Sequence, residues 1–181
     1  GTQAEQTGAI MIRFEEYLMK NRTDLVLVVG DVTSTMACAI TAQKLHIKVA
    51  HVEAGIRTND WTMPEEINRL VTDAITNYFF TTSEVANKSL RASGHHDDQI
   101  FFVGNCMIDT LLVNRPRFIQ PSIWIELGLG EKGYFMMTLH RPANVDEGAK
   151  LKELMDEIIN NTEDMPLVFP VHPRTKKMLN E

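Results

Sequence analysis

The sequence has few cysteines and no long apolar run, and each absence excludes a class of protein. Cys38 and Cys106 are the only two cysteines, and they lie far apart outside any Cys-x-x-Cys pattern. Neither a disulfide framework nor a thiolate metal site is therefore indicated. No stretch approaches the length of a membrane span, and the first residues lack a basic region and an apolar signal core. We expect a protein of the reducing cytoplasm with no membrane partner.

Positive charge is also sparse. The chain has 18 Lys and Arg against 24 Asp and Glu, a formal net charge of -6, and no stripe of clustered cations. Nucleic acid is therefore not an expected partner. What is present suits a soluble globular protein, since 44% of the 181 residues are hydrophobic. This length can bury one good core or the halves of two smaller ones.

Apolar runs of strand length alternate with segments of helical spacing, which predicts an α/β fold with parallel sheets. Leu25–Val29 is a continuous apolar run of the kind found in strands buried on both faces. The predicted strands are 25–29, 49–52, 78–81, 100–103, 134–138 and 167–171. The predicted helices are a first one around 10–18, then 33–45, 64–75, 83–93 and 147–161, and a last one that begins near Thr175 and continues to Glu181.

The alternation breaks after Asp109, through Arg115-Pro-Arg, Gln120-Pro-Ser and the glycines that follow. We therefore predict two parallel sheets rather than one. Residues 1–114 would form the first domain, 115–133 the domain junction, and 134–181 the start of a second domain.

In open parallel sheets ligands bind beyond the carboxyl ends of the strands, so polar residues that follow the apolar runs are candidates. Asp31 follows the first run, and a turn with a helix N-cap would equally explain it. Glu53 lies between Val52 and Ala54, where partial burial suits acid–base work, although a surface glutamate is the alternative. Arg57 ends the segment that follows the second apolar run and is a candidate for substrate binding.

Pro64-Glu65-Glu66-Ile-Asn-Arg69 predicts the start of a helix. Proline at the first position and acids in the first turn are explained by helix formation alone. In the functional interpretation, Glu65 reaches the ligand, and Arg69, one turn on, lies on the same helix face and holds phosphate.

Two His-Arg sets follow the later strands. His140-Arg141 and His172-Pro-Arg174 offer donors to a diphosphate, with imidazoles that can carry charge or a proton. Structural histidines are the alternative. His95-His96-Asp97-Asp98 lacks defined partner spacing for a metal, and we interpret it as a solvated turn.

Six phrases in order resemble the non-hydrolysing UDP-N-acetylglucosamine 2-epimerase family. They are Gly30-Asp-Val-Thr-Ser-Thr, His51-Val-Glu-Ala-Gly-Ile-Arg57, Pro64-Glu-Glu-Ile-Asn-Arg69, Gly104-Asn105 with Asp109, His140-Arg-Pro-Ala-Asn144 and Val171-His-Pro173. The resemblance covers nearly the whole chain. Cys106 departs from it, since a hydroxyl residue is common at that position.

The resemblance implies a GT-B-like architecture, with two Rossmann-like domains and the site in the cleft between them, usually in a homodimer. Such enzymes eliminate UDP from UDP-GlcNAc to leave 2-acetamidoglucal, then add UDP back with inverted stereochemistry to give UDP-ManNAc, without metal or nicotinamide. By resemblance, Asp31, Glu53 and Glu65 match the catalytic carboxylates, and His140 matches a histidine that assists departure of UDP. Arg69 and His172 match residues that bind nucleotide. Cell-envelope polysaccharide synthesis is the implied role.

Three other functions compete with this one. A hydrolysing epimerase would release ManNAc and UDP, a GT-B glycosyltransferase would share the fold but need an acceptor site, and a truncated remnant would be inactive. Family members are about twice this length. We therefore expect an internal piece that lacks both ends and is inactive or poorly folded alone.

Overall fold

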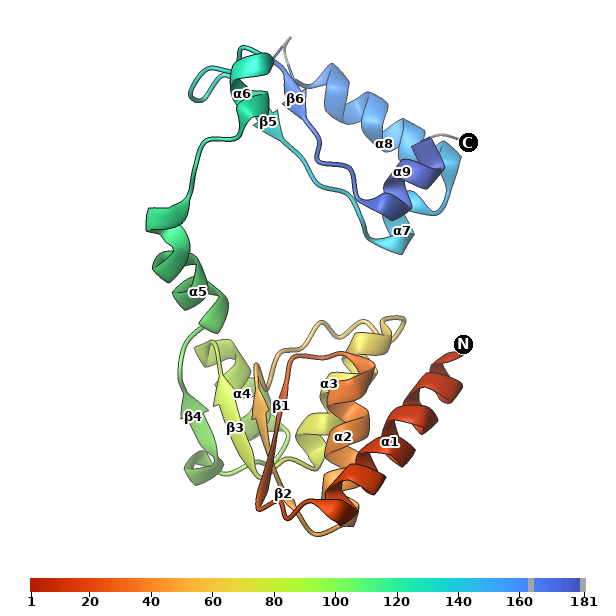
Figure 1. Cartoon of the computed structure of the whole chain (residues 1–181), viewed down its shortest axis with the longest axis vertical. Helices are drawn as coiled ribbons and strands as arrows, with labels where there is room; N and C mark the ends of the chain where they lie inside the picture. Colours follow the sequence, from red (N-terminus) through yellow and green to blue (C-terminus); the bar gives the residue numbers. More distant parts are fainter. Residues whose placement is uncertain (163–164, 180–181) are drawn as a thin grey trace. The chain divides into compact units, whose positions relative to one another are not determined.

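Strands and helices alternate along most of the chain in the computed structural model, which describes residues 1–162 and 165–179. The chain divides into two units, Gly1–Pro116 and Arg117–Glu181. The first unit contains α1 (Gln3–Lys20), β1 (Leu25–Val29), α2 (Thr33–Lys44), β2 (Lys48–Val52), α3 (Pro64–Ala74), β3 (Tyr78–Thr81), α4 (Glu84–Ala92), β4 (Ile100–Phe102) and α5 (Cys106–Asn114) (Figure 1). The strands and helices predicted before residue 104 are confirmed, with ends that differ by one or two residues, except that the first helix begins at Gln3, seven residues before the predicted start.

The strands of the first unit form one parallel sheet in the order β1-β2-β3-β4. The register pairs Val26 with Val49 and His51 with Phe79, so all four carboxyl ends lie at the same edge. Polar loops that follow β1 and β2 are therefore neighbours in space, although about twenty residues separate them in sequence. This edge carries the candidate site.

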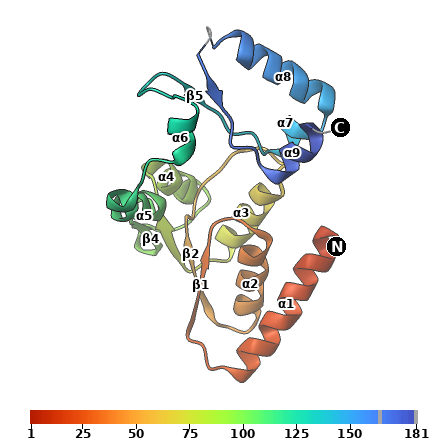
Figure 2. The same cartoon turned by 45° about the horizontal axis from the view of Figure 1, so that its top comes forward.

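The core of the first unit lies between the sheet and its helices. In Figures 1 and 2, α1, α2 and α3 lie side by side, and α2 packs against β1 and β2. The buried apolar side chains there are Leu18, Val26, Val28, Ala39, Ala42 and Val49. Several are alanines, which let helix and strand approach closely.

The prediction that Leu25–Val29 is buried on both faces is wrong for this structure. Val26 and Val28 are buried, whereas Leu25, Leu27 and Val29 are 46%, 56% and 53% exposed. The reason is that β1 is an edge strand of the described sheet, and its alternate side chains point away from the helix layer.

The second unit contains α6 (Ser122–Glu126), β5 (Phe135–Met136), α7 (Pro142–Val145), α8 (Gly148–Asn160), β6 (Leu167–Val168) and α9 (Pro173–Leu179). β5 and β6 pair in parallel, as predicted, but each spans only two residues because it has a single partner strand. Val145 and Leu151 are buried where α7 packs against α8 (Figure 2). The last predicted helix is confirmed as α9, although its two final residues lie outside the described residues.

The structure adds helices where the sequence pattern predicts none, namely α5, α6 and α7. Asn105 begins α5 by accepting a hydrogen bond from the Met107 N–H at 2.9 Å. The α5 sequence is mostly apolar, with Asp109, Thr110 and Asn114 as its polar residues, so its helical periodicity is weak. None of the helices within residues 1–162 and 165–179 is long and apolar enough to cross a bilayer.

Candidate functional site

Glu53 lies directly after β2, at the carboxyl edge of the first sheet. Its φ of 71° is uncommon for a residue with a side chain, and its N–H donates to the Phe80 carbonyl at 3.0 Å. One oxygen of its carboxylate lies 3.6 Å from the position that a Cβ on Gly30 would occupy. The half-buried Glu53 side chain therefore lies beside the turn that carries Asp31.

Asp31 is held from the neighbouring helix α3. Arg69 Nη1 donates to Asp31 Oδ2 at 2.5 Å, and Asn68 Nδ2 donates to the Asp31 backbone carbonyl at 2.8 Å. The Asp31 side chain is 38% exposed, whereas the Arg69 side chain is only 7% exposed. A buried cation thus orients a carboxylate that solvent, and therefore a ligand, can still reach.

Arg69 directs its remaining donors at other protein oxygens. Its Nε and Nη2 contact Glu66 Oε2 at 2.9 and 2.8 Å, and Nη2 also donates to the Thr58 hydroxyl at 3.2 Å. In the functional interpretation Arg69 lies on the same helix face as Glu65 and holds phosphate, and in this structure its guanidinium contacts protein oxygens. Arg69 faces inward because three carboxylate contacts and one hydroxyl satisfy its charge there.

Glu66 is buried and ties the loop after Arg57 to α3. Its carboxylate accepts from the Thr58 N–H at 3.1 Å, the Asn59 N–H at 3.0 Å and the Thr58 hydroxyl at 3.0 Å. Burial alone would raise the pKa of Glu66, but these bonds and the Arg69 guanidinium outweigh it and lower the pKa to about 2. At neutral pH Glu66 is therefore an anion rather than a proton carrier.

A second buried carboxylate of α3, Asp73, holds the loop around Glu53. Asp73 Oδ1 lies 2.7 Å from His51 Nδ1, while Oδ2 accepts from the Gly55 N–H at 3.1 Å and from Arg57 Nη1 at 2.6 Å. The Arg57 side chain is 11% exposed. Arg57, a candidate for substrate binding, therefore contacts a protein carboxylate in this structure.

Glu65 lies in the first turn of α3 and is exposed. It borders a hollow of about 270 Å³, together with residues from α1, the start of α2 and Asn68. Its neighbour Asn68 binds the Asp31 carbonyl, so Glu65 stands on the helix turn that supports Asp31. The three predicted catalytic carboxylates, Asp31, Glu53 and Glu65, thus all lie in the first unit, near the loops that follow β1 and β2.

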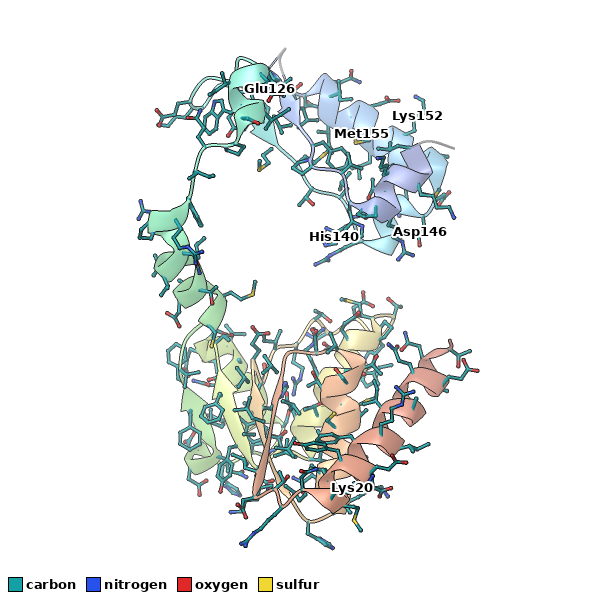
Figure 3. The ribbon with its side chains drawn as sticks, in the orientation of Figure 1. Lys20, Glu126, His140, Asp146, Lys152 and Met155 are labelled. Atoms are coloured by element: carbon teal, nitrogen blue, oxygen red, sulfur yellow. The ribbon has the colours of Figure 1, made fainter. Side chains whose placement is uncertain are left out.

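In the second unit, the structure brings the two predicted histidines together. The rings of His140 and His172 lie 5.9 Å apart between centroids, and both side chains are exposed. Thr175, buried at the start of α9, donates to the Leu139 carbonyl at 2.5 Å and so ties the two histidine segments to each other. Figure 3 shows His140 and Asp146 among the side chains beside α7 and α9.

Arginines flank this histidine pair. Arg141 is exposed next to His140. Arg174 makes two contacts of 2.6 Å with the carboxylate of Asp146, and hydrogen bonding from that guanidinium lowers the pKa of Asp146. The exposed pair of imidazoles with Arg141 can donate to an anion such as a diphosphate.

Sequence reasoning missed Glu66 and Asp73 and gave His51 no role. A signal was available, because Glu66, Arg69 and Asp73 recur at helical spacing along one face of α3. A polar face with that period is usually the solvent face, whereas here it is the buried one.

The segment 95–98 differs in one respect from the solvated turn that we predict. His96, Asp97 and Asp98 are exposed, but the His95 ring packs 4.5 Å from the Phe79 ring, and its burial lowers the pKa of His95. Within residues 1–162 and 165–179, no group of three or more His, Cys, Asp or Glu side chains could hold a metal ion.

Comparison with known proteins finds related sequences and structures. A sequence model of the family described as UDP-N-acetylglucosamine 2-epimerase matches residues 1–181. The chain is 42% identical over 191 residues to a UDP-N-acetylglucosamine 2-epimerase of Methanocaldococcus jannaschii, covering 100% of the chain and 51% of that relative. It is 37% identical to a UDP-2,3-diacetamido-2,3-dideoxy-D-glucuronate 2-epimerase of Pseudomonas aeruginosa, covering 99% of the chain and 50% of that relative.

A solved structure gives the same result. The Methanocaldococcus jannaschii UDP-GlcNAc 2-epimerase, in complex with UDP-GlcNAc and UDP, matches with a TM-score of 0.85 at 41% identity, over 99% of this chain and 51% of that one. The chain spans about half the length of the curated relatives it matches.

Proposed function

The chain belongs to the UDP-N-acetylglucosamine 2-epimerase family, and from this premise we propose that it supplies proton-transfer groups for a non-hydrolysing epimerase that interconverts UDP-GlcNAc and UDP-ManNAc. One observation carries the proposal. Asp31 and Glu53 follow adjacent strands and lie beside one turn, each within reach of solvent. Inversion at a carbon needs proton removal on one face and proton return on the other, which neighbouring carboxylates can provide.

The proposed reaction balances as an elimination followed by an addition. A carboxylate removes the proton on C2, the C2 electron pair forms the C1–C2 double bond, and the C1–O bond to UDP breaks. Addition of UDP to C1 of the resulting 2-acetamidoglucal, with protonation of C2 on the opposite face, gives UDP-ManNAc. Asp31, Glu53 and Glu65 are the proposed proton carriers.

Departure of UDP places negative charge on a diphosphate oxygen, which donors and cations stabilise. We assign this task to the exposed groups of the second unit, with His140 as the group that assists the leaving oxygen and Arg141 and His172 as nucleotide contacts. Arg57 and Arg69 take a different role in the proposal. Both are largely buried against carboxylates, which suits orientation of the proton carriers.

A second substrate has specific support. One relative at 37% identity is named for a UDP-2,3-diacetamido-2,3-dideoxy-D-glucuronate, which shares with UDP-GlcNAc the acetamido group at C2. The same carboxylates could invert that carbon, and the substituents at C3 and C5 would decide between the two sugars.

The family resemblance also supports a homodimer in the cytoplasm that feeds cell-envelope polysaccharide synthesis. Both cysteines are free, which suits a reducing compartment. Light scattering on the full-length natural protein that carries this sequence tests the assembly, and a monomeric mass would remove the dimer from the proposal.

The experiment that tests the function is product analysis by proton NMR after incubation of that full-length protein with UDP-GlcNAc. We expect UDP-ManNAc in equilibrium with UDP-GlcNAc. Free ManNAc with stoichiometric UDP would identify a hydrolysing epimerase instead. A parallel incubation uses the diacetamido glucuronate. If the protein turns over only that sugar nucleotide, it is the substrate, and if neither sugar nucleotide changes, epimerase activity is rejected.

A further inference from the structure

We infer that Asp73 is a positioning residue that fixes the two proton carriers Glu53 and Asp31 relative to each other, acting through His51. The inference rests on the proposed function, because it assigns a task to a buried carboxylate that neither touches the sugar nor carries its proton. Asp73 is 1% exposed and His51 is fully buried, so no ligand reaches either of them.

The contacts of Asp73 reach the Glu53 loop from both sides. His51 precedes Glu53 by two residues, Gly55 follows it by two, and Arg57 follows by four. All three donate to the Asp73 carboxylate, at 2.7, 3.1 and 2.6 Å. A single side chain from α3 therefore holds the segment in which Glu53 stands at the middle.

This loop has a backbone that needs such support. Glu53 has a φ of 71°, in the left-handed region that residues with a side chain adopt only at an energetic cost. Gly55 has a φ of 80°, and a Cβ there would lie 2.5 Å from the Ala86 carbonyl oxygen. The conformation that directs Glu53 towards Gly30 persists only where surrounding contacts impose it.

His51 extends the effect of Asp73 to the neighbouring strand. Its Nε2 lies 2.9 Å from the carbonyl oxygen of Gly30, the residue before Asp31. Both ring nitrogens thus face oxygen atoms, one on Asp73 and one on the backbone before Asp31. Asp73 is itself paired with Arg57. Asp73 therefore fixes the Glu53 loop directly and the Asp31 turn through the His51 ring.

A purely structural role for Asp73 makes a different prediction. It would require that loss of the carboxylate lower stability and leave the turnover of the folded fraction unchanged. A positioning role requires a fall in kcat in folded protein, because displacement of a catalytic group by about 1 Å can cost about 100-fold in rate.

The test uses Asp73→Asn in the full-length natural protein, with Asp97→Asn as the matched control. Asp97 is also paired with an arginine, but it lies on the surface away from the site. We expect kcat for UDP-GlcNAc to fall about 100-fold in Asp73→Asn while KM changes less than about 3-fold. Asp97→Asn should retain both values. Unchanged kcat in folded Asp73→Asn would overturn the inference while leaving the proposed function intact.

A second measurement decides the matter if Asp73→Asn does not fold. Nitrogen-15 NMR of the His51 ring in the wild-type protein should show that Nδ1 is hydrogen-bonded to the Asp73 carboxylate. An Nδ1 without that hydrogen bond would overturn the inference. If the wild type lacks epimerase activity altogether, the proposed function fails, and this ring signal still reports whether Asp73 and His51 form the predicted link.

Discussion

Glu65 and Glu66 are adjacent in sequence and opposite in environment. Glu65 is exposed beside a hollow, whereas Glu66 is 1% exposed and binds the Thr58–Asn59 loop and Arg69. The sequence cannot distinguish the two, because either can be the acid that a helix N-terminus favours. The family resemblance selects Glu65 as the proton carrier, and the geometry gives Glu66 a structural task.

Removal of each charge should therefore have a different effect. Glu66→Gln leaves Arg69 without one buried anion and should lower the free energy of unfolding by about 3 kcal/mol. Glu65→Gln should change it by less than about 0.5 kcal/mol but abolish turnover. Urea titration followed by circular dichroism measures the first effect. Equal stability of the two variants would contradict this assignment.

The low pKa of Glu66 also predicts a pH dependence. The folded protein lowers this pKa from 4.5 to about 2, so the stability that it contributes is present above pH 4.5 and is lost as the pH falls towards 2. The shift corresponds to about 3 kcal/mol. We expect the urea midpoint of the wild type to fall over that range more steeply than that of Glu66→Gln. Parallel curves would argue against the lowered pKa.

Residue-level inference from the sequence succeeded for Asp31 and Glu53 as neighbours and failed for the interior of α3. The position of a polar residue after a parallel strand is set by topology, so it can be read from the order of the elements. The buried face of α3 cannot be read from the sequence, because Glu66, Arg69 and Asp73 face inward while Ile67 is 44% exposed. Hydrophobic periodicity assumes the opposite arrangement.

At the scale of elements, α3 organises the first sheet edge. The carboxylates of Glu66 and Asp73 accept hydrogen bonds from Gly55, Arg57, Thr58 and Asn59, and Arg69 donates to Asp31. The helix therefore orders the loops after both β1 and β2. Elements with strong periodicity or a continuous apolar run were predictable, whereas α5, which is mostly apolar, and α6, which lies in the predicted junction, carry no such signal.

Close packing of the loop after β2 against α4 gives a prediction at this scale. Gly55→Ala would place a Cβ 2.5 Å from the Ala86 carbonyl oxygen and strain a φ of 80°, so we expect a loss of about 3 kcal/mol or more. Gly94→Ala is the control, since its φ of 91° is similar but nothing lies within 4 Å of the added Cβ. It should cost about 1 kcal/mol. Thermal denaturation compares them, and equal losses would show that backbone strain, not contact with α4, decides.

At the scale of the whole molecule, the two units differ in how they are held together. The first has a four-stranded sheet with a buried core, whereas β5 and β6 of the second pair over only two residues each. The division at Pro116 falls within the predicted junction 115–133. The short length of β5 and β6 was not predictable, because a strand's length depends on partners that its own sequence does not reveal.

Limited proteolysis tests the proposed junction. Ile119 and Ile125 are 88% and 77% exposed within 115–133. Thermolysin, which cleaves before large apolar residues, should therefore cut first in this segment and leave a resistant fragment that contains α1 to α5. Mass spectrometry identifies the ends of that fragment. A first cut inside the β2–α3 loop would show that residues 115–133 are not the most accessible segment and would contradict the proposed junction.

We propose that Glu53 transfers a proton at C2 of a UDP-linked 2-acetamido sugar. The most direct measurement is proton NMR of UDP-GlcNAc with the full-length natural protein in deuterated water, in parallel with Glu53→Gln and with Glu15→Gln, an exposed acid on α1. We predict UDP-ManNAc that carries deuterium at C2 for the wild type and for Glu15→Gln, and neither product nor deuterium for Glu53→Gln. UDP-ManNAc that retains hydrogen at C2, or full activity of Glu53→Gln, would show that Glu53 does not transfer this proton.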